Sequence, residues 1–226
     1  ARLDEPDAGV EAALDRALGY ISDEANINRE DTDEQFFAHA YLARCLTRWI
    51  DLRPGDKERV TPRLERATAD LISTQGRSGA WAHEYSNPFV TSDALIALAE
   101  AKRVGVVPED LPKAVERGLA SLLMCRTTEG AYSYGQPRRG KVRASAESSV
   151  GRTPRGELAV TLWSPKDSIG LKKAVVLSFD NEEHLLLAQK YDDHTSSYNY
   201  GGFFFYYDLH ARTEAIAALP KGAPRK

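Results

Sequence analysis

The feature that most constrains the fold of this chain is a sequence unit that recurs about every 50 residues. Each unit has an apolar helical segment, a polar turn in which Gly stands close to an aromatic residue, and a second apolar segment. The first segments align at Leu14–Ala17, Leu64–Ala67 and Ala114–Arg117, and a fourth copy starts near Leu171. Self-similarity at this period predicts stacked helical hairpins, because no single hairpin can bury its apolar face alone.

The same pattern predicts where the turns and helices lie. The turns carry Gly79-Ala80-Trp81, Gly130-Ala131-Tyr132 and Gly201-Gly202-Phe203. The second helix of the second unit is predicted to start at the capping cluster Thr91-Ser92-Asp93. Apolar residues at helical spacing predict the other helices, over residues 9–21, 31–49, 62–72, 112–123, 157–163, 171–179, 182–191 and 208–219.

The composition is that of one large folded domain over residues 1–226. With 42% hydrophobic residues, 28% charged residues and a formal net charge of −3, it gives no global reason to expect a nucleic-acid or membrane partner. No apolar run reaches the roughly 18 residues of a membrane span. Because the chain begins at Ala1 rather than Met, we expect an upstream segment to have been removed, naturally or by design, with export as one explanation.

The third turn is expanded by a basic stretch over residues 136–156. The stretch contains a single acid, Glu147. Its cations are Arg138, Arg139, Lys141, Arg143, Arg152 and Arg155. The stretch is interpreted as a solvated, mobile insertion, with contact to an anionic polymer or a lid over the inner face as alternatives. Residues 138–155 hold no aromatic side chain, so base stacking is not indicated. Residues 221–226 are predicted to be a mobile basic tail.

Two segments carry a resemblance to a known group of proteins. The stretch Gln75–Trp81 resembles the Gln…Gly-Ala-Trp repeats of terpenoid cyclases and protein prenyltransferases. The stretch Phe203–Ala211 resembles an aromatic helix start in planctomycete proteins with prenyltransferase-like domains. The resemblance implies a bacterial, all-α protein in which the second helix of each hairpin lies on an inner ring and the first on an outer ring. Complete α/α toroids use about five to six hairpins, so about four predict an incomplete toroid.

The resemblance extends to one acidic motif. Asp31-Thr32-Asp33-Glu34 resembles the Asp-x-Asp-Asp motif of class II terpene cyclases, in which the middle acid protonates an alkene or epoxide, and Asp33 stands at that position. Such chemistry needs a carboxylic acid that burial and neighbouring carboxylates keep protonated. The fourth acid here is Glu34, and the same acids suit a helix N-terminus, whose dipole favours negative charge. Helix capping is the favoured interpretation of the motif.

The zinc site of protein prenyltransferases is not indicated. That family uses an Asp-x-Cys pair, whereas Ala43 precedes Cys45 and Leu123 precedes Cys125 by two residues. The histidines show no metal-ligand spacing, so no metal and no cofactor is predicted. Both cysteines are interpreted as small buried hydrophobic residues.

A third candidate site is a pocket at the inner end of the ring, where the N-termini of the inner helices would converge. The residues that could meet there are Asp33, Asp93, Asp208, Glu157 and His210, with the aromatic side chains of Trp81, Tyr132 and Tyr206. Carboxylates with aromatic rings suit a carbohydrate or a cationic ligand, and the same carboxylates could act on a glycosidic bond. Alternatively, the acids cap helices and the aromatic side chains fill the gaps between hairpins.

The sequence thus predicts an all-α, incomplete toroid whose concave face binds a small molecule, a glycan or a protein. The alternative is an isoprenoid cyclase-like or glycan-acting enzyme that uses Asp33 or the pair Asp93 and Asp208. No Gly-rich phosphate loop and no Gly-x-Ser-x-Gly motif occurs, so nucleophilic hydrolysis has no support.

Overall fold

The computed structural model describes residues 8–27, 30, 35–137, 142, 144–188 and 203–220. This part of the chain is all-α apart from one short hairpin, so the predicted fold class is confirmed. The hairpin strands are β1 (Ala82–His83) and β2 (Tyr85–Ser86), with Ala82 opposite Ser86. The helices are α1 (Ala8–Ser22), α2 (Gln35–Leu52), α3 (Lys57–Ser73), α4 (Pro88–Arg103), α5 (Leu111–Leu123), α6 (Arg152–Trp163), α7 (Leu171–Asp180), α8 (Glu182–Ala188) and α9 (Phe203–Ala217).

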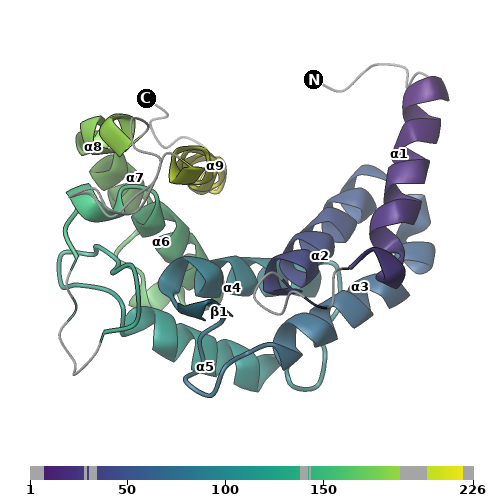
Figure 1. Ribbon diagram of the computed structural model, residues 1–226, viewed down its shortest axis with the longest axis horizontal. Coiled ribbons are helices and arrows are strands. Elements are labelled where there is room, and N and C mark those ends of the chain that lie inside the picture. The colour runs from purple at the N-terminus through teal and green to yellow at the C-terminus, as the bar shows by residue number, and fades with distance from the viewer. Residues whose placement is uncertain are drawn as a thin grey trace.

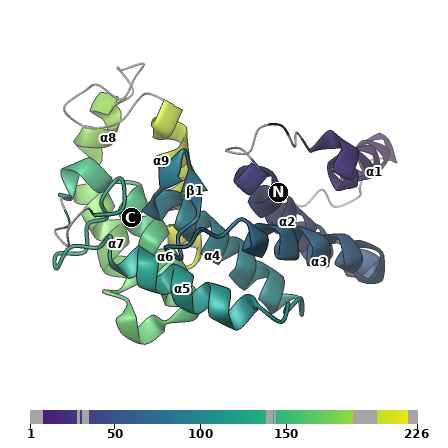
Figure 2. The ribbon, with the colours of Figure 1, turned by 60° about the horizontal axis from the view of Figure 1, so that its bottom comes forward.

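The helices form two layers that follow an open arc (Figure 1). Helices α2, α4, α6 and α9 contact one another in series and make the inner layer. Helices α3, α5 and α7 lie outside α2, α4 and α6, respectively, as Figures 1 and 2 show from two directions. Helix α1 lies at one end of the arc, and α7 and α8 lie at the other. The described helices therefore form an arc rather than a closed ring, and the second helix of each hairpin lies inside.

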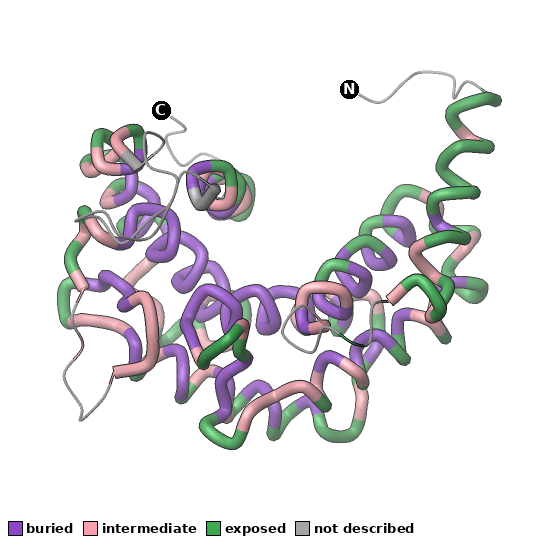
Figure 3. Tube along the Cα trace, in the orientation of Figure 1, coloured by how far each residue is buried: buried purple, intermediate pink, exposed green. Residues whose placement is uncertain are grey.

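The hydrophobic core lies between the two layers. One cluster joins α4, α5 and α6 around Trp81, Leu95 and Leu122, and a second joins α1, α2 and α3 around Leu46 and Leu64. In Figure 3 the tube is buried along most of α4 and the first part of α6, and mostly exposed along α1. The inner layer thus packs on the outer helices, and α1 is the least embedded of the long helices.

Three inner helices, α4, α6 and α9, start earlier than the sequence pattern predicted. Helix α4 starts at Pro88, and the side chain of Asn87 caps it by accepting a hydrogen bond from the Val90 N–H at 2.9 Å. Asn is a favoured N-cap and Pro a favoured first residue, so the predicted start at Thr91-Ser92-Asp93 is wrong and Asp93 lies inside the helix. Similarly, α9 starts at Phe203 rather than Asp208.

The basic stretch of the third turn is in part helical. Helix α6 starts at Arg152, so Arg152 and Arg155 belong to its first turns, and both side chains are buried. Their assignment to a solvated insertion is wrong, because each guanidinium is matched by nearby acids or carbonyl groups. Arg138, Arg139, Lys141 and Arg143 lie outside the described residues, as do the motif Asp31–Glu34 and the tail 221–226. Cys125 is buried as predicted, but Cys45 is exposed.

In the glycine-aromatic turns, the aromatic rings pack closely against glycines of the neighbouring helices. Gly79 and Gly130 have φ angles of +85° and +105°, which favour glycine. Trp81 and Tyr132 are completely buried. A Cβ atom at Gly118 of α5 would lie 2.8 Å from the Trp81 ring, and one at Gly156 of α6 would lie 2.6 Å from the Tyr132 ring. Each aromatic ring therefore occupies space that a larger residue on the facing helix would fill.

Substituting alanine for the helical glycine that faces the Tyr132 ring is expected to destabilise the protein. Gly156→Ala should lower the free energy of unfolding by about 1–3 kcal/mol, the usual effect of overpacking, although alanine favours helix by about 1 kcal/mol. Gly19→Ala on α1 is the matched control, because nothing lies within 4 Å of its added Cβ. Urea denaturation should show a loss for Gly156→Ala and no loss for Gly19→Ala. Equal stability of the two variants would contradict the close fit.

Candidate functional site

The inner layer presents one stripe of side chains from each of its four helices toward the concave face. On α4 the stripe is Phe89, Asp93, Ile96, Glu100 and Arg103, whose spacing of three and four residues places them on one side of the helix. The matching positions on the other helices are Tyr41, Arg44 and Arg48 of α2, Arg155, Leu158 and Leu162 of α6, and Tyr207, His210 and Glu214 of α9. The stripes of α2, α4 and α9 begin with an aromatic side chain, and that of α6 begins with Arg155 and continues with two leucines.

A network of ion pairs joins the four inner helices in the middle of this face. The guanidinium of Arg155 is completely buried and contacts the carboxylates of Asp93 and Glu214. Arg44 contacts Glu214 as well, and its Nε donates to Glu100 at 3.3 Å. Two arginines therefore share one glutamate, and α9 is tied to both α6 and α2 through Glu214.

The network holds Glu214 in the ionised form. Burial alone would raise the pKa of the Glu214 carboxyl, but the guanidinium groups of Arg155 and Arg44 outweigh burial and hold this pKa below its ordinary value. The Tyr207 hydroxyl donates to Asp93 Oδ2 at 3.2 Å. Burial, together with the Asp93 carboxylate, raises the pKa of Tyr207 well above its ordinary value, so this hydroxyl keeps its proton.

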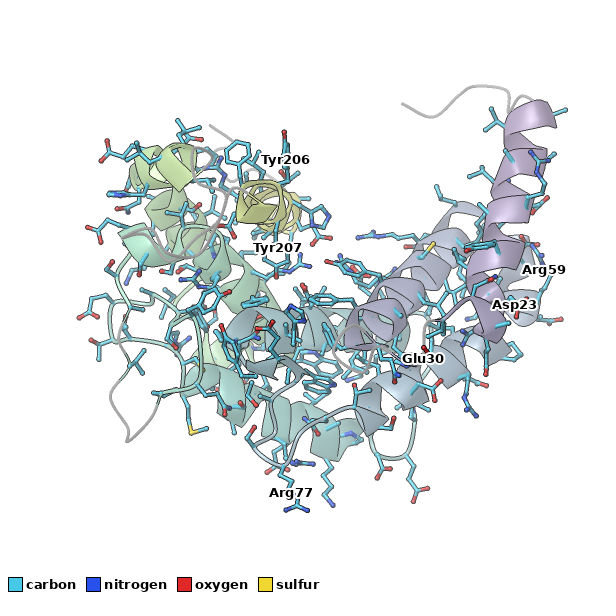
Figure 4. All side chains as sticks on the ribbon, in the orientation of Figure 1. Asp23, Glu30, Arg59, Arg77, Tyr206 and Tyr207 are labelled. Atoms are coloured by element: carbon cyan, nitrogen blue, oxygen red, sulfur yellow. The ribbon has the colours of Figure 1, made fainter. Side chains whose placement is uncertain are left out.

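Aromatic side chains gather at the end of the inner face where α2, α4 and α9 begin. The ring of Phe89 lies 5.6 Å from that of Tyr134 and 6.0 Å from that of Tyr207, centroid to centroid. Phe37 stacks on Tyr41 at 6.1 Å. These contacts fall within the range of favourable aromatic pairs. In Figure 4, Tyr207 points from α9 toward α4, whereas Tyr206 points to the opposite side of α9.

The other end of the inner face holds a cavity of about 300 Å³, which we call the inner cavity. Its apolar lining comes from three of the inner helices, through Ile96 and Ala99 of α4, Leu158 and Leu162 of α6, and Ala217 and the adjacent Ala218 at the end of α9. Its charged lining consists of Arg48, Glu100, Arg103 and Glu214. The cavity therefore lies directly beside the ion-pair network, which forms part of its wall.

The structure brings some of the predicted site residues together and separates others. Asp93 lies at the centre of the inner face. Glu157 and Tyr132 contact each other, since the Tyr132 hydroxyl donates to Glu157 Oε1 at 2.8 Å. The same carboxylate accepts hydrogen bonds from Arg126 Nη1 at 2.8 Å and from the Ile169 N–H at 3.0 Å. Glu157 thus joins the third turn to the start of α7, deep in the protein.

The remaining predicted residues lie apart from the inner cavity or on the surface. The Trp81 indole is buried and donates to the Leu71 carbonyl at 2.8 Å. Tyr206 is exposed. His210 is half-exposed, with Nδ1 3.7 Å from Glu214. Asp33 lies outside the described residues, so its predicted role is unchanged.

Asp208 is buried where α9 meets the start of α6. A Cβ atom at Gly151 would lie 2.0 Å from the Asp208 carboxyl carbon, which shows how closely the side chain approaches this backbone. Burial raises the pKa of Asp208 from its ordinary value of 3.8 to about 7, and the Arg152 and Arg212 cations and the Gly151 N–H oppose this rise. Asp208 is not one of the described residues that line the inner cavity.

Sequence reasoning did not identify Arg44, Glu100, Arg155 and Glu214 as site residues. The spacing of Asp93, Glu100 and Arg103 along α4 was a usable signal, but Arg155 had been placed in a loop. Within the described ranges, no group of three or more His, Cys, Asp or Glu side chains could hold a metal ion. No described helix is long and apolar enough to cross a membrane. No protein-family model, curated protein or solved structure matches the chain.

Proposed function

We propose that this chain is a ligand-binding module that holds a small molecule in the inner cavity without transforming it. The observation that carries the proposal is the cavity of about 300 Å³ on the concave side of four helices. This volume lies at the lower end of the range of about 300–1,000 Å³ typical of small-molecule sites. The ion pairs of Arg44 and Arg155 fix the helices around the cavity, so little ordering of the protein has to accompany binding.

The alternative, an enzyme that uses its carboxylates for proton transfer, has less support. A general acid must be protonated near neutral pH and must reach the substrate. Asp93 and Glu214 both form ion pairs with Arg155, and the pKa of Glu214 is held below its ordinary value. The carboxyl group with a raised pKa, Asp208, is packed against Gly151 instead of lining the cavity. The acid with the raised pKa is thus apart from the cavity, and Glu214, which lines the cavity, has a lowered pKa, so binding is favoured over catalysis.

Filling the inner cavity should abolish ligand binding. Ala217 lines the cavity and is exposed, so Ala217→Trp can block it without a change to the core. Medium-chain carboxylates, oligosaccharides and isoprenoid diphosphates would be screened by thermal shift, since a ligand of the native state raises its apparent stability. We expect at least one class to raise the melting temperature of the wild type and of the control Ala13→Trp on α1, but not of Ala217→Trp. A response that survives in Ala217→Trp, or none from any class, would refute the proposal.

A further inference from the structure

The accessible charge around the inner cavity is positive. Arg48 of α2 and Arg103 at the end of α4 have side chains that are 62% and 51% exposed. The acids that line the same cavity, Glu100 and Glu214, are only 14% and 18% exposed. A ligand that enters from solvent therefore meets the two guanidinium groups before it meets either carboxylate.

The two arginines retain capacity for a further acceptor, whereas the two acids are engaged. Arg48 Nη2 donates to Glu100 at 3.2 Å, and Arg103 makes two hydrogen bonds to Asp51, at 2.8 and 2.6 Å. Each guanidinium has five N–H donors, so these contacts leave donors for another oxygen. A cationic ligand, in contrast, would have to compete with Arg44 and Arg155 for Glu100 and Glu214.

The charge balance at the rim suits one negative charge rather than several. Arg48 is partly neutralised by Glu100, and Arg103 is paired with Asp51. A diphosphate would bring more negative charge than these two half-neutralised cations can offset. A carboxylate matches the planar fork of arginine with a single charge.

The cavity size limits the rest of the ligand. At roughly 30 Å³ for each non-hydrogen atom, the share of one water molecule in the liquid, a cavity of about 300 Å³ holds about ten such atoms. The apolar wall of Ile96, Leu158 and Leu162 favours hydrocarbon for this part of the ligand.

We propose that the ligand class is a medium-chain monocarboxylate of about eight to ten carbons. Its carboxylate lies at the rim on Arg48 and Arg103, and its alkyl chain lies in the inner cavity. This inference rests on the proposed function, because it names the ligand of the same cavity.

The test is calorimetric titration of the full chain with octanoate, 1-octanol and octylamine, all below the concentrations at which they aggregate. We expect octanoate to bind at least about tenfold more tightly than the other two, since charge-assisted hydrogen bonds are the stronger kind. Arg48→Gln should weaken octanoate binding by about tenfold and leave octanol binding unchanged. Arg77→Gln is the matched control, because Arg77 is exposed at the outer side of the arc (Figure 4). Arg77→Gln should change neither octanoate binding nor octanol binding.

The outcomes separate this inference from the proposed function. Equal binding of octanoate and octanol, both lost in Ala217→Trp, would overturn carboxylate recognition and retain the cavity as a binding site. Tightest binding of octylamine, or of an isoprenoid diphosphate in the thermal-shift screen, would overturn the ligand class in the same way. If Ala217→Trp changes the binding of neither octanoate nor any other screened class, the proposed function itself is wrong.

Discussion

Replacing Arg155 by methionine is expected to lower the free energy of unfolding by about 3–5 kcal/mol, the usual cost of removing one partner from a buried ion pair. Arg155 is fully buried and serves both Asp93 and Glu214. Without it, the Asp93 carboxylate stays buried with only the Tyr207 hydroxyl as a described hydrogen-bond donor. Chemical denaturation at pH 7 would measure the loss.

Two further variants make this expectation specific. Arg66→Gln is the control, because Arg66 is exposed and pairs with Asp70 at the surface, where an ion pair contributes about 1 kcal/mol or less. The double variant with Asp93→Leu added to Arg155→Met should recover part of the loss, since it removes the uncompensated charge. A double variant that is less stable than Arg155→Met alone would contradict the electrostatic origin of the effect.

The second large effect is a fall in stability with rising pH that depends on Asp208. Its pKa in the folded protein is about 7, above the ordinary value of 3.8. A raised folded-state pKa means that the stabilising contribution is complete below about pH 4 and is lost as the pH rises through 7. At about 1.4 kcal/mol for each pH unit, Asp208 should lower the free energy of unfolding by about 4 kcal/mol between pH 4 and pH 8.

The variant Asp208→Asn isolates this contribution. Asparagine keeps the shape of the protonated acid but cannot ionise, so the stability of the variant relative to the wild type should rise from pH 4.5 to about pH 7 and level off above it. Urea denaturation across this range gives the difference directly. Asp180→Asn, at an exposed position on α7, should show no such trend. A constant difference between Asp208→Asn and the wild type at all pH values would show that ionisation of Asp208 is not coupled to folding.

The repeat predicts the hairpins well, because burial of an apolar stripe leaves a clear period in the sequence. Helices α1, α5 and α7 lie within a residue or so of their predicted positions. The starts of α4 and α6 were predicted too late for physical reasons. Asn87-Pro88 is a strong start signal, but the cluster at Thr91–Asp93 looked like a cap. Arg155 looked solvated because a single sequence does not reveal which distant acid will neutralise a cation.

The candidate site was less predictable than the fold. Asp93 was selected as an acid at a helix start, yet it lies on the inner face as part of a stripe. Arg155, which pairs with it, and Glu214, which shares Arg155 with it, are 62 and 121 positions away along the chain (155 − 93 and 214 − 93). Only the stacking of the hairpins brings these residues together. The same stacking leaves the Arg48 side chain exposed and buries most of the Glu100 side chain.

The two glycine-aromatic turns are alike in sequence, but their rings pack against helices of different units. Trp81 of the second unit packs against Gly118 on the outer helix of the next unit, whereas Tyr132 of the third unit packs against Gly156 on the inner helix of its own unit. The first contact fastens neighbours to each other, and the second braces one hairpin internally. Two turns of similar sequence therefore stabilise different contacts of the arc.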